Sequence, residues 1–470
     1  MFLVVILLVA AGFWWQRNQA LLLWSDIREG DGSVLSLAAG KDSRGNEIVV
    51  AGGYFRTDGS GRDLRILCYD AADGRVRWET REDKALPNMM TEPIISIDSA
   101  GDVLVGWEIA AARFGANKVV SKYAGIDGHL LWNWSLDNTD SGSSLTAIPL
   151  ASESGALWVS GIRKISGEYR RFVAALDMKT GVLLWEDDLN VARDGFDRPA
   201  EIQHLKNGGA MVVIPPPCVE GKLPWIIQNR SGVDGGVRWQ HEILWDDGRF
   251  CRVEWLMDQA NDQMVIAWNS KTSGQEHVHI AALNLTTGAE RWHVRDINIG
   301  ELRYVESVTL GQDGGIELWG GKMTLIVYTK WWRWRINDGI PSPERLENMT
   351  DQPLRVTLSP MDGSIRKSKV FARPEERVKA RLGRPGEATE VLILQEFCGD
   401  LSAMFGEPEV NTWRAKVITP QFRLVVPIRE PEGTMTSLDF PDHAVLTPSG
   451  RLVIGGCPAK DQRQWQIRVW

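Results

Sequence analysis

The sequence predicts an all-β protein: an eight-bladed β-propeller, with seven blades as the alternative, closed by its N- and C-terminal strands. Three observations predict this fold. A Gly-to-Trp motif recurs at a steady period, each period holds about four strand-like segments, and the first and last repeats are each incomplete. A period of 53 or 54 residues with four strands is typical of a propeller blade rather than of a helical solenoid.

The recurring motif places a tryptophan four residues after a glycine. Its five copies end at Trp78, Trp132, Trp185, Trp239 and Trp292, at steps of 54, 53, 54 and 53 residues. An Asp-Gly or Thr-Gly pair between apolar alternating runs indicates a β-hairpin, because Gly accepts the positive φ that the turn requires. The tryptophan then has a fixed place on one face of the next strand.

The two ends of the chain look like parts of one blade. One more step back from the first copy falls on Trp24, in a strand-like run over residues 21–26 that no repeat turn precedes. The chain ends in the strand-like runs 451–456 and 464–470, which lack a fourth partner. We therefore expect the first strand to pair with the last ones, because closing the ring removes exposed strand edges.

The second half of the sequence departs from the repeat. Residues 358–363 carry the same turn, but Lys367 stands where tryptophan is expected. The step from Trp292 to this position is 75 residues, so the sixth repeat holds an insertion near 330–356. Strand patterns then continue to the C-terminus. We predict that the propeller spans residues 20–470, and that the eight-blade count falls to seven if residues 330–433 form one elaborate blade.

Residues 1–19 are interpreted as a signal peptide or a membrane anchor. The run from Phe2 to Trp15 is apolar and uncharged, which suits a signal-peptide core and is short for a transmembrane helix. No Lys or Arg precedes it, which departs from the usual basic start, and no cysteine follows it for a lipid anchor. A buried strand or helix is the alternative. Only residues 16–20 separate the run from the first strand, so a tethered propeller would lie close to the bilayer.

Charge and cysteine content exclude several classes of function. The net charge is −8 and the basic residues are scattered, which argues against nucleic-acid binding. The five cysteines are odd in number and never form a C-x-x-C pair, so they indicate neither a disulfide framework nor a zinc site.

The repeat resembles the tryptophan-docking motif of the pyrroloquinoline quinone (PQQ) dehydrogenases and their non-enzymatic envelope relatives. Residues 175–185 match the pattern A-x-D-x-x-T-G-x-x-x-W at every fixed position. Residues 282–292 match it with Asn284 in place of Asp, and the other three copies keep mainly the Gly and the Trp. The resemblance implies that each indole packs against the Gly turn of the neighbouring blade. This structural docking role falls on Trp24, Trp78, Trp132, Trp185, Trp239 and Trp292.

The non-enzymatic members of this group are the better match. The dehydrogenases carry a vicinal disulfide against the cofactor, and no two cysteines are adjacent in this sequence. PQQ and Ca²⁺ follow only from the resemblance, since no motif identifies residues that would bind them. We therefore expect an exported, non-catalytic scaffold for envelope proteins, with no cofactor and no metal. A PQQ- and Ca²⁺-dependent dehydrogenase, or a propeller that binds a glycan or small ligand, are the alternatives.

Other candidate sites are weak. Residues 137–142 resemble the start of a calcium loop, but its twelfth position is Ile148 rather than Glu, which favours an ordinary polar loop. His277 and His279 would share one face of a strand, yet no third ligand accompanies them. No P-loop and no G-x-S-x-G motif occur. Catalytic residues are therefore not predicted.

One segment suggests a partner-binding surface. Residues 330–335 read KWWRWR and follow a strand-like run beside the predicted insertion. Indoles mixed with Arg are typical of the centre of protein interfaces. Filling of an irregular blade and contact with a membrane interface are the alternatives. The candidate partner-binding residues are Trp331, Trp332, Arg333, Trp334 and Arg335.

Overall fold

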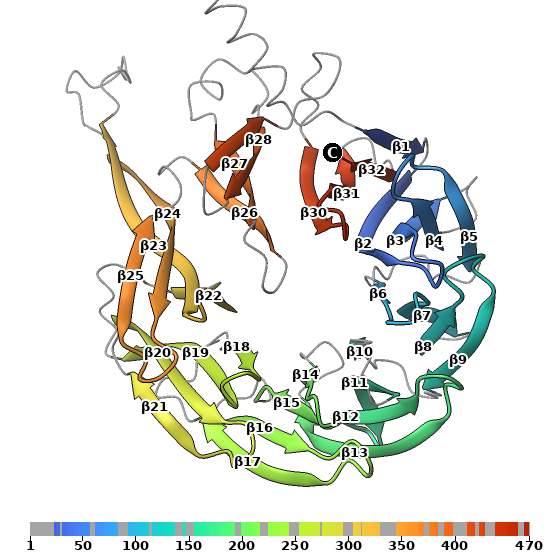
Figure 1. The fold of residues 1–470 in the computed structure, drawn as a ribbon, viewed down its shortest axis with the longest axis horizontal. Coiled ribbons are helices and arrows are strands. Elements are labelled where there is room, and N and C mark those ends of the chain that lie inside the picture. Colours follow the sequence, from blue (N-terminus) through green and yellow to red (C-terminus); the bar gives the residue numbers. More distant parts are fainter. Residues whose placement is uncertain are drawn as a thin grey trace, which may run out of the picture. The chain divides into compact units, whose positions relative to one another are not determined.

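The computed structural model consists of strands and turns. It describes residues 23–28, 31–56, 62–82, 93–111, 115–136, 144–146, 155–192, 199–216, 224–243, 253–272, 275–294, 304–311, 313–329, 345–370, 376–383, 390–397, 411–418, 423–427, 438–458 and 465–469. In these ranges the strands form four-stranded antiparallel sheets, shown in Figure 1. The predicted all-β class is confirmed, and the sheets are of the kind that forms propeller blades.

The chain divides into two compact units. The first comprises Met1–Gly248, Thr286–Gly288 and Glu430–Trp470, and the second comprises Arg249–Leu285 and Ala289–Arg429. The number of blades in a single ring stays a prediction.

The first unit holds five of the sheets. Four of them have consecutive strands: β2 (Asp31–Lys41), β3 (Glu47–Arg56), β4 (Arg62–Asp70) and β5 (Val76–Glu82); β6 (Ile94–Ile97), β7 (Val103–Ala111), β8 (Gly115–Tyr123) and β9 (Leu130–Leu136); β10 (Ser144–Thr146), β11 (Ala156–Ile165), β12 (Glu168–Asp177) and β13 (Leu183–Ala192); β14 (Glu201–His204), β15 (Ala210–Ile214), β16 (Trp225–Arg230) and β17 (Val237–Ile243). The fifth has the order β1 (Trp24–Arg28), β32 (Trp465–Val469), β31 (Leu452–Pro458), β30 (Leu438–Leu446).

The second unit holds three sheets, again of consecutive strands. They are β18 (Val253–Asp258), β19 (Gln263–Thr272), β20 (Gln275–Asn284) and β21 (Glu290–Val294); β22 (Tyr304–Leu310), β23 (Ile316–Thr329), β24 (Arg345–Leu358) and β25 (Ile365–Val370); β26 (Glu376–Gly383), β27 (Glu390–Phe397), β28 (Asn411–Ile418) and β29 (Arg423–Pro427).

The first and last strands of the chain share a sheet, as predicted. Strand β1 pairs antiparallel with β32 from Trp24 opposite Val469 to Arg28 opposite Trp465, and it forms the sheet's outer edge (Figure 1). The observed strand begins slightly later than the predicted run 21–26. Thus three strands from the C-terminus and one from the N-terminus build a single sheet.

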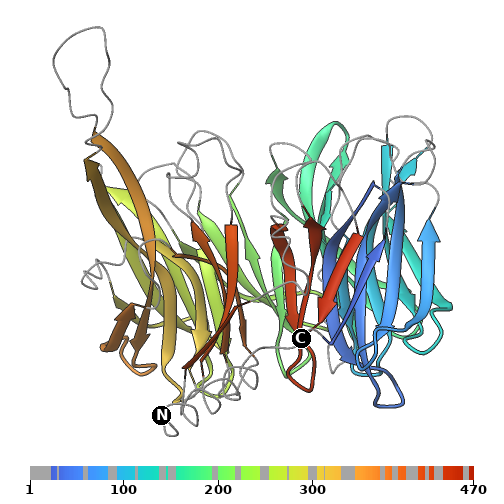
Figure 2. The same cartoon turned by 90° about the horizontal axis from the view of Figure 1, so that it is seen from above.

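The predicted insertion lies in an elongated hairpin of the second unit. Strands β23 and β24 each run for 14 residues and pair from Ile316 opposite Leu358 out to Thr329 opposite Arg345. They therefore extend beyond the 7-residue β22 and the 6-residue β25 of their sheet (Figure 2). Residues 330–344, between the two strands, lie outside the described residues.

Apolar side chains fill the space between neighbouring sheets of the first unit, and between two sheets of the second. Ile48, Val50 and Ile66 of one sheet are fully buried together with Val103 and Val105 of the next. A close approach occurs where β3 faces β6: a Cβ added to Gly52 would lie 2.4 Å from Ile95 Cδ1. The sheets are thus packed face to face through hydrophobic cores. In the described part of the chain, no helix has the length and hydropathy needed to span a membrane.

We predict that the sheet shared by the two ends depends on Ile467. Its side chain is fully buried in the core between β32 and the neighbouring sheet. Ile467→Ala should lower the free energy of unfolding by about 2–4 kcal/mol through lost burial and the cavity left behind. Ser25→Ala, at an exposed position of β1, should change it by less than about 0.5 kcal/mol. Urea denaturation measures both values, and equal effects would contradict the prediction.

Candidate functional site

The most regular site in the structure is the contact between a tryptophan and a glycine turn. Each of six indoles lies over the turn between the third and fourth strands of the next sheet. A Cβ added to the turn glycine would lie 2.4–2.8 Å from the nearest indole atom in every case. The pairs are Trp24 with Gly74, Trp78 with Gly128, Trp132 with Gly181, Trp185 with Gly235, Trp239 with Gly288, and Trp292 with Gly363.

The glycines are required for two separate reasons. Each of the six has a positive φ, between 70° and 75°, a backbone conformation that side chains disfavour. Each also leaves no space for a Cβ beneath the indole. Within one repeat the tryptophan stands four residues after the glycine. This distance places it on the outer strand, at a position that faces the neighbouring sheet.

The indole N–H groups fix the orientation of the rings. Five of the six donate hydrogen bonds of 3.0–3.5 Å to a backbone carbonyl three residues before the turn glycine. The acceptors for Trp24, Trp78, Trp132, Trp185 and Trp292 belong to Ala71, Gly125, Met178, Gly232 and Pro360. A buried indole thus satisfies its one donor while its ring covers the turn, which combines apolar burial with a directional contact.

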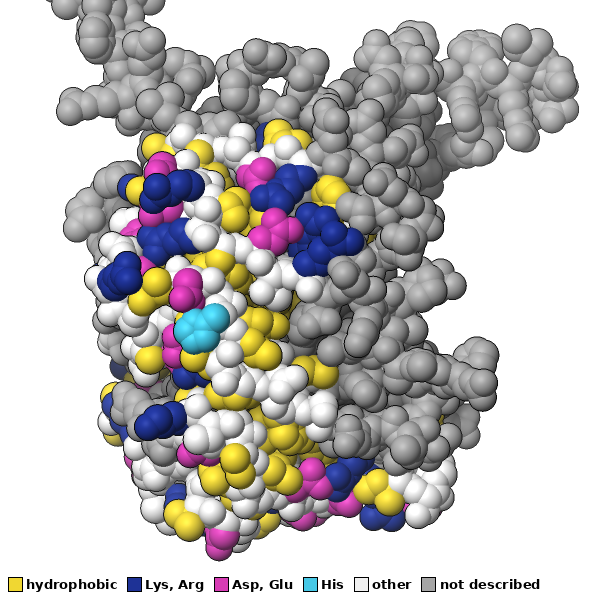
Figure 3. Space-filling view, turned by 90° about the vertical axis from the view of Figure 1, so that its right-hand side faces the viewer, with side chains coloured by type: hydrophobic (Ala, Val, Ile, Leu, Met, Phe, Trp, Pro, Cys, Tyr) yellow, Lys and Arg dark blue, Asp and Glu magenta, His cyan; other side chains and the backbone are white. Residues whose placement is uncertain are grey.

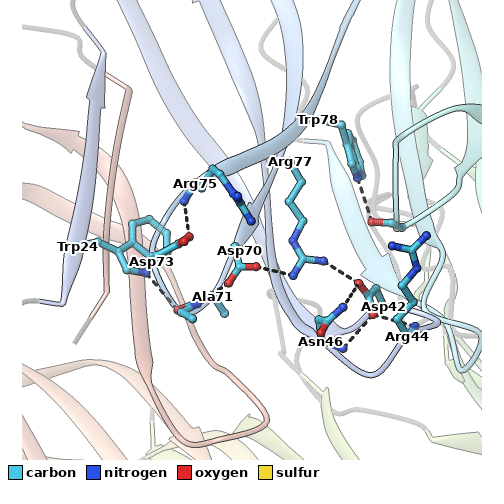
Figure 4. Close-up of polar contacts among 12 residues, drawn as sticks. Trp24, Asp42, Arg44, Asn46, Asp70, Ala71, Asp73, Arg75, Arg77 and Trp78 are labelled. Carbon is cyan, nitrogen blue, oxygen red and sulfur yellow. Dashed lines mark hydrogen bonds and ion pairs between the residues drawn. The ribbon is translucent and has the colours of Figure 1, made fainter.

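A second, smaller motif lies at the turn between the first and second strands. Asp42 directly follows β2, and its carboxylate accepts hydrogen bonds from the backbone N–H groups of Arg44 and Asn46, both at 2.9 Å. Arg77 Nη1 lies 2.6 Å from Asp42 Oδ2, and Arg77 Nη2 lies 2.7 Å from Asp70 Oδ2. The guanidinium therefore links both turns at this end of the sheet (Figure 4).

The same arrangement occurs in the next sheet with different residues. The carboxylate of Asp98 accepts from the backbone of Ala100 and Asp102, and Lys122 Nζ lies 2.8 Å from Asp98 Oδ2. In the second unit Asp258 accepts from Asn261 and from the side chain of Gln263. These aspartates are buried. Sequence reasoning missed them, although the strings DSRGN and DSAGD carry the signal: an Asp that precedes a turn glycine by three residues.

Burial and hydrogen bonding act in opposite directions on the Asp42 carboxyl. Burial raises its pKa, but the Asn46 side chain and backbone, the Arg77 guanidinium and the Arg44 backbone together lower it below its ordinary value. The pKa of Arg77 is raised, because its two carboxylate partners outweigh the cost of burial. Both groups are therefore charged at neutral pH, and they form an ion pair with each other inside the fold.

Ion pairs also connect the outer strand β13 to its surroundings. Arg163 contacts Glu186 and Asp188 of its own sheet. Asp187, which points to the other face, lies 2.7 Å from Arg230 Nη1 of the following sheet. Arg230 is buried and also donates to the carbonyl of Gly235, 3.0 Å away, in the turn that Trp185 covers.

The remaining predicted sites are not brought together by the described structure. The partner-binding residues Trp331, Trp332, Arg333, Trp334 and Arg335 and the loop at 137–142 lie outside the described residues. His279 stacks on Trp268 at a centroid distance of 5.2 Å, and the centroid of His293 lies 6.1 Å from that of His279. Among the described residues, no group of three or more His, Cys, Asp or Glu could hold a metal ion. Burial raises the pKa of the Cys68 thiol to about 12.

Comparison with known proteins gives one sequence match. Residues 21–204 match a family model described as "Outer membrane protein assembly factor BamB", one of the PQQ-type repeat models. The resemblance to the PQQ-like propeller repeat is confirmed. The matched range contains four of the six docking tryptophans: Trp24, Trp78, Trp132 and Trp185. No curated protein sequence matches the chain.

Several solved structures are similar in fold. BamB from Moraxella catarrhalis is 14% identical with a TM-score of 0.41, over 79% of this chain and 96% of that one. A quinohemoprotein alcohol dehydrogenase, ADHIIG from Pseudomonas putida HK5, is 11% identical with a TM-score of 0.48, over 96% and 75%. An ulvan lyase of polysaccharide lyase family PL25 is 10% identical with a TM-score of 0.43, over 94% and 95%. At these identities the likenesses concern at most the fold.

We predict that Gly181 tolerates alanine less well than Gly167 of the same sheet. Both have a positive φ, 71° and 88°, but a Cβ at Gly167 meets nothing within 4 Å, whereas one at Gly181 would lie 2.6 Å from Trp132 Cε3. Gly167→Ala should cost about 1 kcal/mol of stability through backbone strain. Gly181→Ala should cost about 2 kcal/mol more. In a Trp132→Ala background the difference should vanish; equal costs in the parent chain would refute the docking role.

We also predict that the Asp42 contribution to stability is lost at low pH. Because its pKa is lower in the folded than in the unfolded chain, the ionised carboxylate stabilises the fold above the unfolded pKa. That contribution disappears as the pH falls through the lower, folded pKa. Asp42→Asn should therefore cost about 2 kcal/mol at pH 7 and progressively less below about pH 4. Urea unfolding across this range measures it, with Asp73→Asn, an exposed turn position of the same sheet, as the control.

Proposed function

We propose that this chain is a non-catalytic propeller of the bacterial envelope that serves as a rigid scaffold for other envelope proteins. The observation that carries the proposal is the match of residues 21–204 to a family model described as an outer-membrane assembly factor. The proposed location is outside the cytoplasmic membrane, with the apolar run from Phe2 to Trp15 as export signal or tether.

The chemistry of the described charged groups supports a scaffold. Arg77 and Lys122 are held between turn carboxylates, and Arg230 is held between a neighbouring strand and a docking turn. These ion pairs join strands within a sheet and, at Arg230, one sheet to the next, which makes the arrangement of sheets rigid. A rigid sheet stack presents side chains and loops at fixed positions, and this lowers the entropic cost of binding a partner.

We further propose that the segment from Trp331 to Arg335 contacts the partner. Three indoles and two guanidinium groups in five residues form the composition that is enriched in interface hot spots. In the sequence the segment comes just after Thr329, the last residue of β23, which pairs with Arg345 at one end of the elongated hairpin. This end of the sheet is opposite the turn around Gly363, so altering the segment leaves the docking contact of Trp292 untouched.

The test is capture of partners from the envelope. We expect a tagged full chain, crosslinked in detergent-solubilised envelope, to retain one protein in stoichiometric amount. Replacing Trp331, Trp332 and Trp334 together by Ser should reduce the yield at least about tenfold, given about 2 kcal/mol or more for a hot-spot residue. The control is Ile365→Ser, an exposed position in the same sheet, which should leave the yield unchanged.

Two results would overturn the proposal. If no protein is retained in stoichiometric amount, the scaffold function is wrong. If the purified chain, given PQQ and Ca²⁺, develops quinone absorbance and reduces an artificial electron acceptor in the presence of alcohols, the chain is an enzyme instead. Retention of the partner by the triple tryptophan variant would reject only the assignment of the segment.

A further inference from the structure

Large hydrophobic side chains are exposed along one edge of the first unit. They lie in or just after the turns that the indoles cover, at the start of the outer strands β5, β9, β13 and β17. We call them the turn rim: Val76, Leu130, Leu131, Val182, Leu183, Leu184, Val233 and Val237, which are between 36% and 89% exposed.

These residues form a row because the docking contacts bring the turns together. Trp132, at the start of β9, lies over the Gly181 turn that begins β13, and Trp185 of β13 lies over the Gly235 turn that begins β17. Successive turns of the first unit are therefore neighbours along a single edge. Figure 3 shows part of the surface, where hydrophobic side chains lie among charged ones.

The docking contact does not require these apolar residues. Between Gly181 and Trp185 the chain reads Val-Leu-Leu, whereas between Gly288 and Trp292 it reads Ala-Glu-Arg. Both glycines have a positive φ, 71° at Gly181 and 73° at Gly288, and both lie beneath an indole. A polar sequence thus satisfies the same turn, so the docking contact does not account for the exposed leucines and valines of the turn rim. A row of exposed apolar side chains of this kind is typical of a contact surface.

Strand β1 begins at this same edge. Trp24 lies over the Gly74 turn, and the preceding Leu23 is 51% exposed while its N–H donates to the carbonyl of Val469. The apolar run that ends at Trp15 is therefore connected to the turn rim by a short stretch of chain. If this run inserts into a bilayer, the turn rim is the edge held closest to it.

The charges along the turn rim are balanced. Asp73, Asp127 and Asp234 each accept a hydrogen bond from a backbone N–H two residues further on. Exposed basic side chains stand in these or neighbouring turns, at Arg75 and Lys179, and at the start of β17, at Arg238. A mixed polar and apolar edge of this kind suits the headgroup region of a membrane, where apolar side chains reach the acyl boundary and charged ones stay hydrated.

We propose that the turn rim of the first unit rests on a lipid surface. The proposal depends on the membrane tether proposed above and adds which edge of the molecule faces the bilayer. It does not depend on a protein partner, so it can be tested with purified chain and lipid alone.

The test compares two turns at opposite ends of one sheet. The full chain is incubated with vesicles of phosphatidylethanolamine and phosphatidylglycerol, and deuterium uptake is followed by mass spectrometry. Backbone amides of residues 181–184 should exchange about tenfold more slowly on vesicles than in solution, because lipid excludes water from the turn. The turn at residues 166–167, at the opposite end of β12, should exchange at the same rate in both conditions.

Matched variants assign the effect to the turn rim. Leu130→Ser combined with Leu184→Ser removes two half-exposed leucines and should abolish the slower exchange. Ile27→Ser is the control: it is 48% exposed on β1, three residues beyond the docked Trp24 and therefore about 10 Å along the strand. The control should keep the full effect.

Each contrary outcome has a distinct meaning. If the chain does not bind vesicles at all, both the tether and the turn-rim proposal are wrong. Binding with equal exchange at residues 181–184 on vesicles and in solution overturns the turn-rim proposal and leaves the tether standing. If exchange at residues 181–184 becomes slower with rising protein concentration in the absence of lipid, the turn rim contacts a second copy of the chain. That result also overturns the turn-rim proposal.

Discussion

The structure depends on one repeated contact, an indole placed over a glycine that has a positive φ. The contact requires a residue without a side chain at the turn and a large flat one on the neighbouring sheet. Neither requirement can be met within a single blade. Each repeat therefore completes the one beside it, which is why the period of the sequence is kept so closely from Trp24 to Trp292 while other positions change freely.

The charged side chains at the turns also hold separate parts of the chain together. Arg77 immediately precedes the docking tryptophan Trp78, so alternation along β5 sends the two side chains to opposite faces. One reaches the next sheet, while the other joins Asp42 and Asp70 at the turns of its own sheet. A dipeptide thus serves both cohesion within the blade and contact between blades. Replacing either member of such a buried pair leaves a charge without its partner.

The periodic features of the fold could be predicted from the sequence. The ion pairs between side chains that are far apart in the chain could not. The Gly-to-Trp spacing and the strand pattern were enough to predict the sheets and the meeting of β1 with β32, because each rests on local pattern and repetition. The docking of the indoles on the glycine turns followed from the resemblance to the PQQ-type repeat. Asp42 was overlooked because its cation stands 35 residues away, so no local window holds both. The segment around Trp332 attracted notice by composition alone. Its role stays a prediction, since spacing and burial say nothing about it.

The sheet formed by both ends of the chain has a consequence for biogenesis. Its outer strand is made first and its next strand last, so more than 400 residues separate neighbours in the ladder. During synthesis β1 has no partner in this sheet until β32 has been made. Pairing over such a distance is slow, which leaves time for a chaperone or a protease to act on the incomplete molecule.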